Sequence, residues 1–99
     1  MRLSYWEAID ELNKGKKVRR IGWDDDKLFL KMKEQSKVNT ENLYSKEYKD
    51  AVSNVEAEKV IISSHYDLFK ETEGGNIVVM VGWNPDQEDV GVEDYIIVE

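Results

Sequence analysis

The sequence predicts an α+β fold, in which a small antiparallel sheet packs against an N-terminal helix and a second short helix lies in the middle segment. Three patterns support it: helical spacing of apolar residues near the N-terminus, alternation of apolar residues with lysine over 28–32, and a Gly-Gly-Asn turn between two apolar runs. The chain has 99 residues and contains no repeat, low-complexity tract or linker. We therefore expect one domain spanning 1–99, with a thin core.

The first helix is expected over residues 4–14. Ser4 and Glu7 have the spacing of a capping box, in which each side chain bonds the backbone N–H of the other residue. Gly15 is a typical C-terminal stop. Apolar residues at helical spacing predict one buried face: Trp6, Ile9 and Leu12, with Tyr5 and Ala8 beside them.

Two hairpins are expected after this helix. Residues 18–23 and 28–32 form the first, joined by the Asp24–Asp26 turn, and residues 66–71 and 77–82 form the second, around Gly74-Gly75-Asn76. Residues 59–64 continue toward 66–71 as extended chain, either separately or as one strand bent near His65. The last strand is expected at 95–98.

Two further helical segments are expected. The middle helix covers residues 41–54, because Tyr44, Tyr48 and Val52 recur at intervals of four and Thr40 can cap it. A short helical turn follows Pro85, which suits the first helical position, with Asn84 as its N-cap.

The charge of −7 excludes some functions. Long DNA or RNA needs a broad basic surface, which this acidic chain lacks. The chain has no cysteine, no signal-peptide pattern and no apolar run long enough for a membrane span. We therefore expect a cytoplasmic protein that binds neither long nucleic acid nor membrane. Residues 71–99, which we call the acidic C-terminal segment, contain no Lys or Arg. Their acidic residues are Glu71, Glu73, Asp86, Glu88, Asp89, Glu93, Asp94 and Glu99.

No set of residues has the pattern of an active site. Ser63, His65 and Asp67 alternate along one predicted strand, which does not place a nucleophile against its base. The Asp24–Asp26 run lacks the glycine and distant glutamate of a calcium loop, and Gly74-Gly75 lacks the lysine and helix of a phosphate loop. We therefore expect a protein that is not an enzyme and has neither a cofactor nor a metal.

The residues favour a binding protein built around two tryptophans. Trp23 and Trp83 each follow a glycine at a predicted strand end, where an indole could stack on a nucleobase. The alternative is that both indoles belong to the core.

Polar residues near these indoles complete the predicted site. By strand alternation Arg19 shares a face with Trp23, whereas Arg20 lies on the other face. Either guanidinium could bind a phosphate; the alternative is an ion pair with the acidic C-terminal segment. Backbone N–H groups after Pro85 could also receive a phosphate. Amide and carboxylate groups could bind ribose hydroxyls and base edges: Asn84, Asp86, Gln87 and Asp89. Asp86 could equally be a first-turn helix residue.

Both ends of the chain resemble one phage and prophage family. Residues 4–23 read SYWEAIDELNKGKKVRRIGW, a helix, a Gly-Lys-Lys turn and a strand ending Arg-x-Gly-Trp. Residues 83–98 read Trp-x-Pro-x-Gln-x-Asp-x-x-Val-x-Asp-Tyr-x-x-Val. Both blocks are similar to the second Thoeris anti-defence proteins, long catalogued as a domain of unknown function. Three positions depart from the family pattern: Asp86 for serine, Val92 for alanine and Tyr95 for tryptophan.

The resemblance implies a phage sponge that acts in the cytoplasm of an infected bacterial host. It implies a homotetramer with pockets between protomers that sequesters glycocyclic ADP-ribose without cleaving it. A dimer is the smaller assembly we consider. Some members also hold cyclic di- or trinucleotides at separate sites, for which the basic turn 14–20 is a candidate, or else those cations complement the helix C-terminus. The alternatives are a phage structural or adaptor protein and a cyclic-nucleotide hydrolase.

Overall fold

The computed structural model describes residues 1–43 and 45–99, and its α+β class confirms the prediction. Tyr44, which belongs to the predicted stripe of the middle helix, lies outside the described residues. The chain forms two compact units. The sheet unit comprises residues 1–33 and 65–99, and the middle unit comprises residues 34–64.

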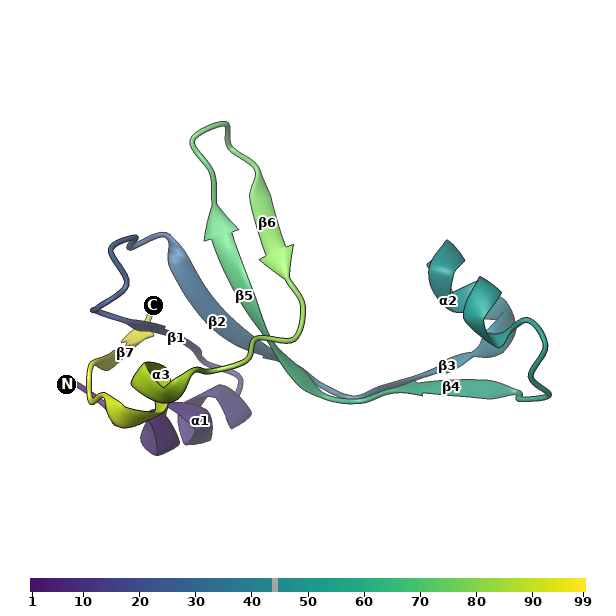
Figure 1. Ribbon diagram of the computed structural model, residues 1–99, viewed down its shortest axis with the longest axis horizontal. Coiled ribbons are helices and arrows are strands. Elements are labelled where there is room, and N and C mark those ends of the chain that lie inside the picture. The colour runs from purple at the N-terminus through teal and green to yellow at the C-terminus, as the bar shows by residue number, and fades with distance from the viewer. Residues whose placement is uncertain (44) are drawn as a thin grey trace. The chain divides into compact units, whose positions relative to one another are not determined.

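The sheet unit contains a five-stranded antiparallel sheet in the order β6-β5-β2-β1-β7. Helix α1 contacts β1, β2 and β7, and it also contacts α3 (Figure 1). Both predicted hairpins are confirmed, as β1–β2 and β5–β6. The elements are α1 (Tyr5–Asn13), β1 (Lys17–Arg20), β2 (Leu28–Lys33), β5 (His65–Glu71), β6 (Ile77–Met80), α3 (Gln87–Gly91) and β7 (Tyr95–Val98).

Helix α1 begins as predicted, because Ser4 and Glu7 form both bonds of the capping box. Its buried face differs from the expectation: Ala8 and Leu12 are buried, whereas the Trp6 side chain is 68% exposed. The sheet-facing stripe follows positions 5, 8, 9 and 12, the i, i+3, i+4, i+7 series, and Trp6 lies beside that series. Trp6 is therefore a surface residue of this chain.

The core is small and lies between α1 and the sheet. Val18 and Leu30, which pair across β1 and β2, are completely buried, and Tyr95 of β7 is 1% exposed. Leu3 adds a bridge to Tyr95 beside β7. The half-buried residues packed on this core include Tyr5, Trp23 and Trp83, so the core brings both predicted indoles to one part of the sheet unit.

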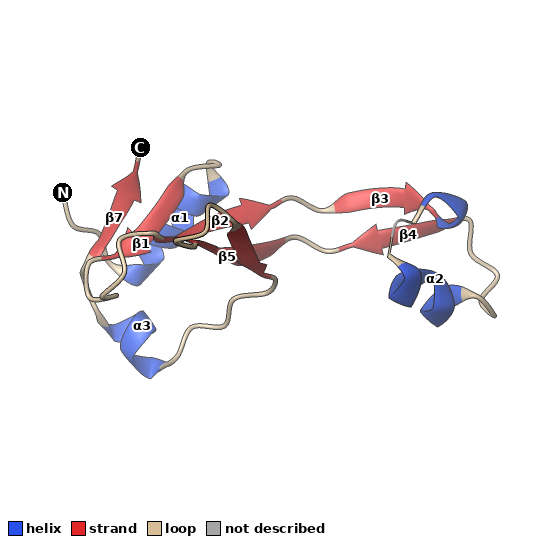
Figure 2. Cartoon of the chain, turned by 90° about the horizontal axis from the view of Figure 1, so that it is seen from above, coloured by secondary structure: helices blue, strands red, loops and turns tan. Residues whose placement is uncertain are grey.

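The middle unit is a two-stranded hairpin of β3 (Ser36–Asn39) and β4 (Lys59–Ile62), with a 3-10 turn (Thr40–Asn42) and α2 (Lys46–Val52) in its connection (Figure 2). Helix α2 confirms a helix in the middle segment, but its cap is Ser45, whose hydroxyl accepts the Tyr48 N–H, so the prediction for Thr40 is wrong. Thr40 instead donates its hydroxyl to the Ala57 carbonyl across the hairpin. The single bent strand is also wrong, since β4 and β5 belong to different sheets.

Candidate functional site

The two glycine-linked tryptophans lie next to each other. The Trp23 and Trp83 ring centroids are 6.3 Å apart with planes at 77°, an edge-to-face contact. Both side chains are half-buried against the core. The indoles therefore form one aromatic surface rather than two separate stacking sites.

Helix α1 extends this surface with two more rings. The Tyr5 ring lies 6.4 Å from Trp83 and 6.2 Å from Tyr95, and Trp6 packs edge-on against Tyr5 at 4.9 Å. We call these five residues, Tyr5, Trp6, Trp23, Trp83 and Tyr95, the aromatic cluster. Burial raises the pKa of Tyr95, with the Asp89 carboxylate adding to the shift, and the Tyr95 hydroxyl donates to the Asp89 carbonyl at 2.8 Å. Solvent exposure within the cluster therefore increases from the buried Tyr95 to the exposed Trp6.

Trp23 reaches the cluster through a turn and not along a strand. Strand β1 ends at Arg20, and the Trp23 N–H donates to the Arg20 carbonyl at 3.2 Å. The predicted strand over 18–23 is therefore three residues too long. The prediction that Arg19 and Trp23 share a face is wrong for the same reason, because side-chain alternation ends with the strand at Arg20.

Arg20 lies at the centre of a buried ionic network. Its side chain is 6% exposed and donates Nη1 to Asp89 at 2.6 Å and Nε to Asp94 at 3.0 Å. A weaker 3.4 Å bond joins Nη2 to the exposed Glu88. Arg20 therefore forms the ion pair with the acidic C-terminal segment, the alternative considered from the sequence.

The network shifts the pKa values of Arg20 and Asp94. Bonds to Asp94 and Asp89 raise the pKa of Arg20 against the opposing effect of burial, so the guanidinium stays charged. Burial raises the pKa of Asp94, but its bonds to Arg20 and the Gly22 N–H outweigh this effect, and the net pKa is lowered. Such a saturated arginine positions its neighbours more readily than it receives a phosphate.

Helix α3 begins later than predicted. Its N-cap is Asp86 and not Asn84. The Asp86 carboxylate accepts a hydrogen bond from the Asp89 N–H at 2.8 Å, and the Asp89 carboxylate accepts one from the Asp86 N–H at 3.0 Å. Pro85 precedes the cap and is not the first helical residue. This reciprocal capping occupies the N–H groups of Asp86 and Asp89, which were predicted to be available to a phosphate. Asp86 caps the helix and lies one position before its first turn.

The remaining predicted residues divide between the two faces. Asn84 and Gln87 are exposed next to Trp83 and α3 and are open to a ligand. Arg19 is half-buried and alternates with the buried Val18 and Arg20, so it lies on the sheet face away from the core. The structure therefore gathers Trp23, Trp83, Arg20, Asn84, Asp86, Gln87 and Asp89, and separates Arg19 from them.

Asp67 supports the turn at Gly82-Trp83, which we call the Trp83 corner. The sequence did not predict this role for Asp67. Its carboxylate accepts the Gly82 N–H at 3.1 Å and lies 2.7 Å from His65 Nδ1, while the Trp83 N–H donates to the Tyr66 carbonyl at 2.7 Å. Asp67 is 6% exposed. The available sequence signal was a carboxylate between Tyr66 and Leu68 in a predicted strand, since such a group requires partners if its strand is buried.

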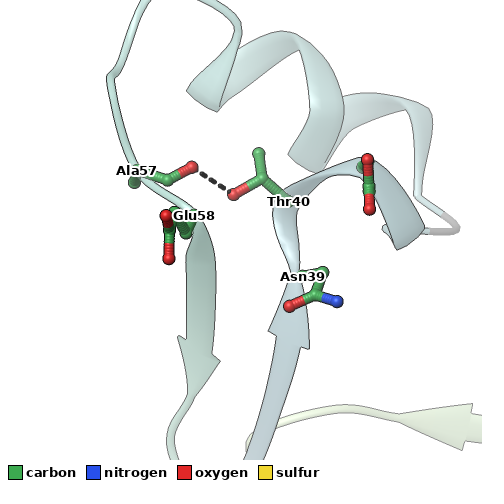
Figure 3. Close-up of a pocket in the computed structure, with 5 residues that line it drawn as sticks. Asn39, Thr40, Ala57 and Glu58 are labelled. Atoms are coloured by element: carbon green, nitrogen blue, oxygen red, sulfur yellow. Dashed lines mark hydrogen bonds between the residues drawn. The ribbon is translucent and has the colours of Figure 1, made fainter.

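Two surface concavities have linings that include no residue of the aromatic cluster. One, of about 390 Å³, is in the middle unit between Asn39, Thr40, Glu41, Ala57 and Glu58 (Figure 3); its two glutamates and lack of a cation disfavour an anionic ligand. Another, of about 400 Å³, is lined by Gly15, Lys16, Lys17, Lys31 and residues 97–99. Its lysines are partly engaged, because Lys16 pairs with Glu11 and Lys31 donates to the Gly15 carbonyl.

Within residues 1–43 and 45–99, no group of three or more acidic or histidine side chains is placed to hold a metal ion. No helix in that part of the chain is long and apolar enough to cross a membrane.

A small antiparallel sheet, covered by a capped N-terminal helix and closed by a tryptophan corner that leads into an acidic helix, defines a compact α+β domain. A family model for the Thoeris anti-defense 2-like domain matches residues 3–98. The chain belongs to this family. No curated protein matches it. Family membership supports a role in Thoeris anti-defence and favours a non-catalytic one.

Proposed function

We propose that this protein binds a cyclic nucleotide immune signal, a cyclic ADP-ribose isomer, at the aromatic cluster and sequesters it without cleavage. The observation that carries the proposal is the convergence of Trp23 and Trp83 within 6.3 Å, beside the exposed Asn84 and Gln87. Family membership supplies the class of function, since a Thoeris anti-defence protein acts against a signalling defence system.

The chemistry of the cluster suits the base and ribose parts of such a ligand. An aromatic face stabilises a stacked base by about 1–3 kcal/mol, and amide and carboxylate side chains discriminate hydroxyls and base edges. Asn84, Gln87 and the cap residue Asp86 supply those groups next to Trp83. The base is therefore assigned to Trp83 and the ribose to the polar residues that follow it.

Phosphate recognition needs cations that this corner does not leave free. Arg20 is saturated by Asp89 and Asp94, and three carboxylates surround its guanidinium. We assign Arg20 to positioning the Trp23 turn and α3, and we assign the phosphates to cations of a neighbouring protomer, consistent with pockets between protomers in a homotetramer or homodimer. Arg19, on the opposite sheet face, is a candidate cation for such a pocket.

Sequestration is distinguished from catalysis by recovering the ligand. The protein is incubated with cyclic ADP-ribose isomers or cyclic dinucleotides and filtered, and the retained fraction is heated to unfold the chain. Intact ligand in the heated fraction supports a sponge. A chemically altered product identifies a hydrolase, and full ligand in the filtrate before heating contradicts binding altogether.

A phage adaptor protein is the second candidate, and one observation favours it. Strand β6 and Trp6 present exposed apolar side chains, which a non-nucleotide partner could cover. An adaptor leaves the ligand in the filtrate, so the recovery experiment separates it from a sponge.

A further inference from the structure

Strand β6 is an open edge with apolar side chains on both faces. It is the terminal strand of the sheet, paired with β5 on one side, and no other described strand pairs with it. Every residue from Ile77 to Val81 is exposed, from 44% for Val79 to 67% for Val81. A strand is usually apolar because its faces are buried or because strands pair with it on both sides. Strand β6 has neither feature.

The sequence of this edge also lacks the usual protection. Soluble proteins block an open edge with charged residues, proline or a bulge. The segment from Gly74 to Met80 carries no charge or proline, in a chain of which 35% of the residues are charged. At the opposite edge of the sheet, β7 is partly covered by the bridge between Leu3 and Tyr95. The unprotected edge is therefore confined to β6.

We infer that β6 pairs antiparallel with β6 of a second copy of this chain, joining two sheets across a two-fold axis. A two-fold contact pairs the strand with its own copy, so a strand with charges of a single sign would repel itself and an uncharged strand does not. Strand β6 meets this condition because Ile77, Val78, Val79 and Met80 are all uncharged. An unrelated peptide partner would not require an edge free of both signs of charge, since opposite charges could then attract.

The small core gives the pairing its driving force. The buried apolar residues of the sheet unit are few, and three of them are Leu3, Ala8 and Leu12. The exposed apolar side chains of β6 could be partly covered by flanking strands of a second sheet. Pairing also satisfies the outward N–H and C=O groups of the edge.

Two-fold symmetry restricts the register to pairings centred on one residue, and the exposed run selects that residue. Hydrogen-bonded and non-bonded pairs alternate along an antiparallel ladder, so a two-fold axis must pass between a residue and its own copy. The exposed run from Ile77 to Val81 is centred on Val79. Val79 therefore lies opposite Val79 of the second copy, and Val78 lies opposite Met80 of the second copy.

The first test measures molar mass by light scattering for the full chain and for Val79→Lys. The wild type is expected as a dimer or larger even-numbered assembly, and Val79→Lys is expected at half the wild-type mass with unchanged circular dichroism. Ile97→Lys is the matched control, since Ile97 lies on the opposite edge strand and is 37% exposed; its mass should equal that of the wild type. A monomeric wild type, an undiminished mass for Val79→Lys, or the same loss in both variants overturns the pairing.

The second test examines the register without weakening the interface. The chain has no cysteine, so Val79→Cys introduces a single thiol, which a short bis-maleimide should link to the same residue of the second copy in most molecules. Ile61→Cys, exposed in the middle unit, measures random collision. Equal linking yields for the two variants would reject the register even if the mass data support a dimer.

Discussion

The two Gly-Trp corners have the same dipeptide for different physical reasons. At Gly22 the backbone dihedral is ordinary, but an added Cβ would lie 2.6 Å from Asp94 Oδ2 and 3.1 Å from Arg20 Nη2. At Gly82 there is open space, but φ is +78°, a region that side chains disfavour. Gly22 is therefore required by crowding, and Gly82 by backbone conformation.

The corners also differ in what holds them. The Gly22 corner is bound by charge, because the Gly22 N–H donates to Asp94 within the Arg20 network. The Gly82 N–H also donates to a carboxylate, that of Asp67, but this corner has an additional bond between backbone groups, from the Trp83 N–H to the Tyr66 carbonyl. Loss of the Arg20 charge should therefore loosen Trp23 before Trp83, because Asp67 and the Tyr66 carbonyl lie outside the Arg20 network. The following predictions test that difference.

The largest effect is expected from removing the charge at the first corner. Arg20→Met leaves Asp89 and Asp94 beside an uncharged side chain, and breaking a buried ion pair in this way costs about 3–5 kcal/mol of unfolding free energy. Urea unfolding followed by tryptophan fluorescence measures it. Arg19→Met is the control, since its half-buried side chain lies outside the network; equal losses in both variants would contradict the assignment of Arg20.

The two glycines should respond differently to alanine and asparagine. Gly22→Ala forces a methyl group into the ionic network and should cost about 2–3 kcal/mol, whereas Gly82→Ala strains a left-handed residue and should cost about 1–2 kcal/mol. Asparagine tolerates left-handed φ, so Gly82→Asn should recover part of the loss and Gly22→Asn should not. Thermal unfolding of the four variants measures this, and a rescue at position 22 would disprove the crowding explanation.

The ligand should depend more on the second corner than on the first. If Trp83 stacks on the base, Trp83→Ala loses about 1–3 kcal/mol of binding, roughly 5- to 150-fold in affinity. Trp23→Ala should lose less, because Asp24–Asp26 follow it whereas the neutral Asn84 follows Trp83. Calorimetry with cyclic ADP-ribose isomers and melting temperature are measured on the same samples. If folded Trp83→Ala binds the ligand as the wild type does, Trp83 is not part of the site. If Trp83 is only a core residue, the same substitution should lower the free energy of unfolding by about 3–5 kcal/mol.

Local signals predicted most of the fold. The Ser4 capping box, the Gly-Gly-Asn hairpin and the strand at 95–98 are confirmed because each depends on a few neighbouring residues. Strand β3 was not predicted, since Ser36–Asn39 has little apolar alternation and pairs with a strand about twenty residues later. The end of β1 was also missed, because the turn after Arg20 depends on distant Asp94.

The sequence indicated which residues the candidate site contains but not how they are arranged. The sequence singled out both tryptophans and the acidic residues of α3, yet gave no sign that the indoles would meet edge to face. The sequence allowed Arg20 either to bind a phosphate or to form an ion pair. Its bonds to Asp89 and Asp94, which lie 69 and 74 residues away, show the ion pair. Such long-range pairing of charges cannot be inferred from residue types alone.

The smallest effect is expected from acid. The pKa of Asp94 is lowered from its ordinary 3.8, so its contribution to stability is complete above the unfolded-state pKa and is lost as the pH falls through the lower folded-state pKa. Asp94→Asn should therefore lower the free energy of unfolding by about 1 kcal/mol near neutral pH, the scale of one hydrogen bond, and should match the wild type below that window.

Glu11→Gln is the matched control. Bonds from Lys16 and Lys14, whose side chains are exposed, lower the pKa of Glu11. High salt should abolish the acid dependence that Glu11 contributes and preserve that of Asp94, whose partner Arg20 is buried. Urea unfolding at pH 2 to 7, with and without 1 M salt, measures both contributions. An Asp94 contribution that disappears in salt would show that the first corner is not held by a buried charge.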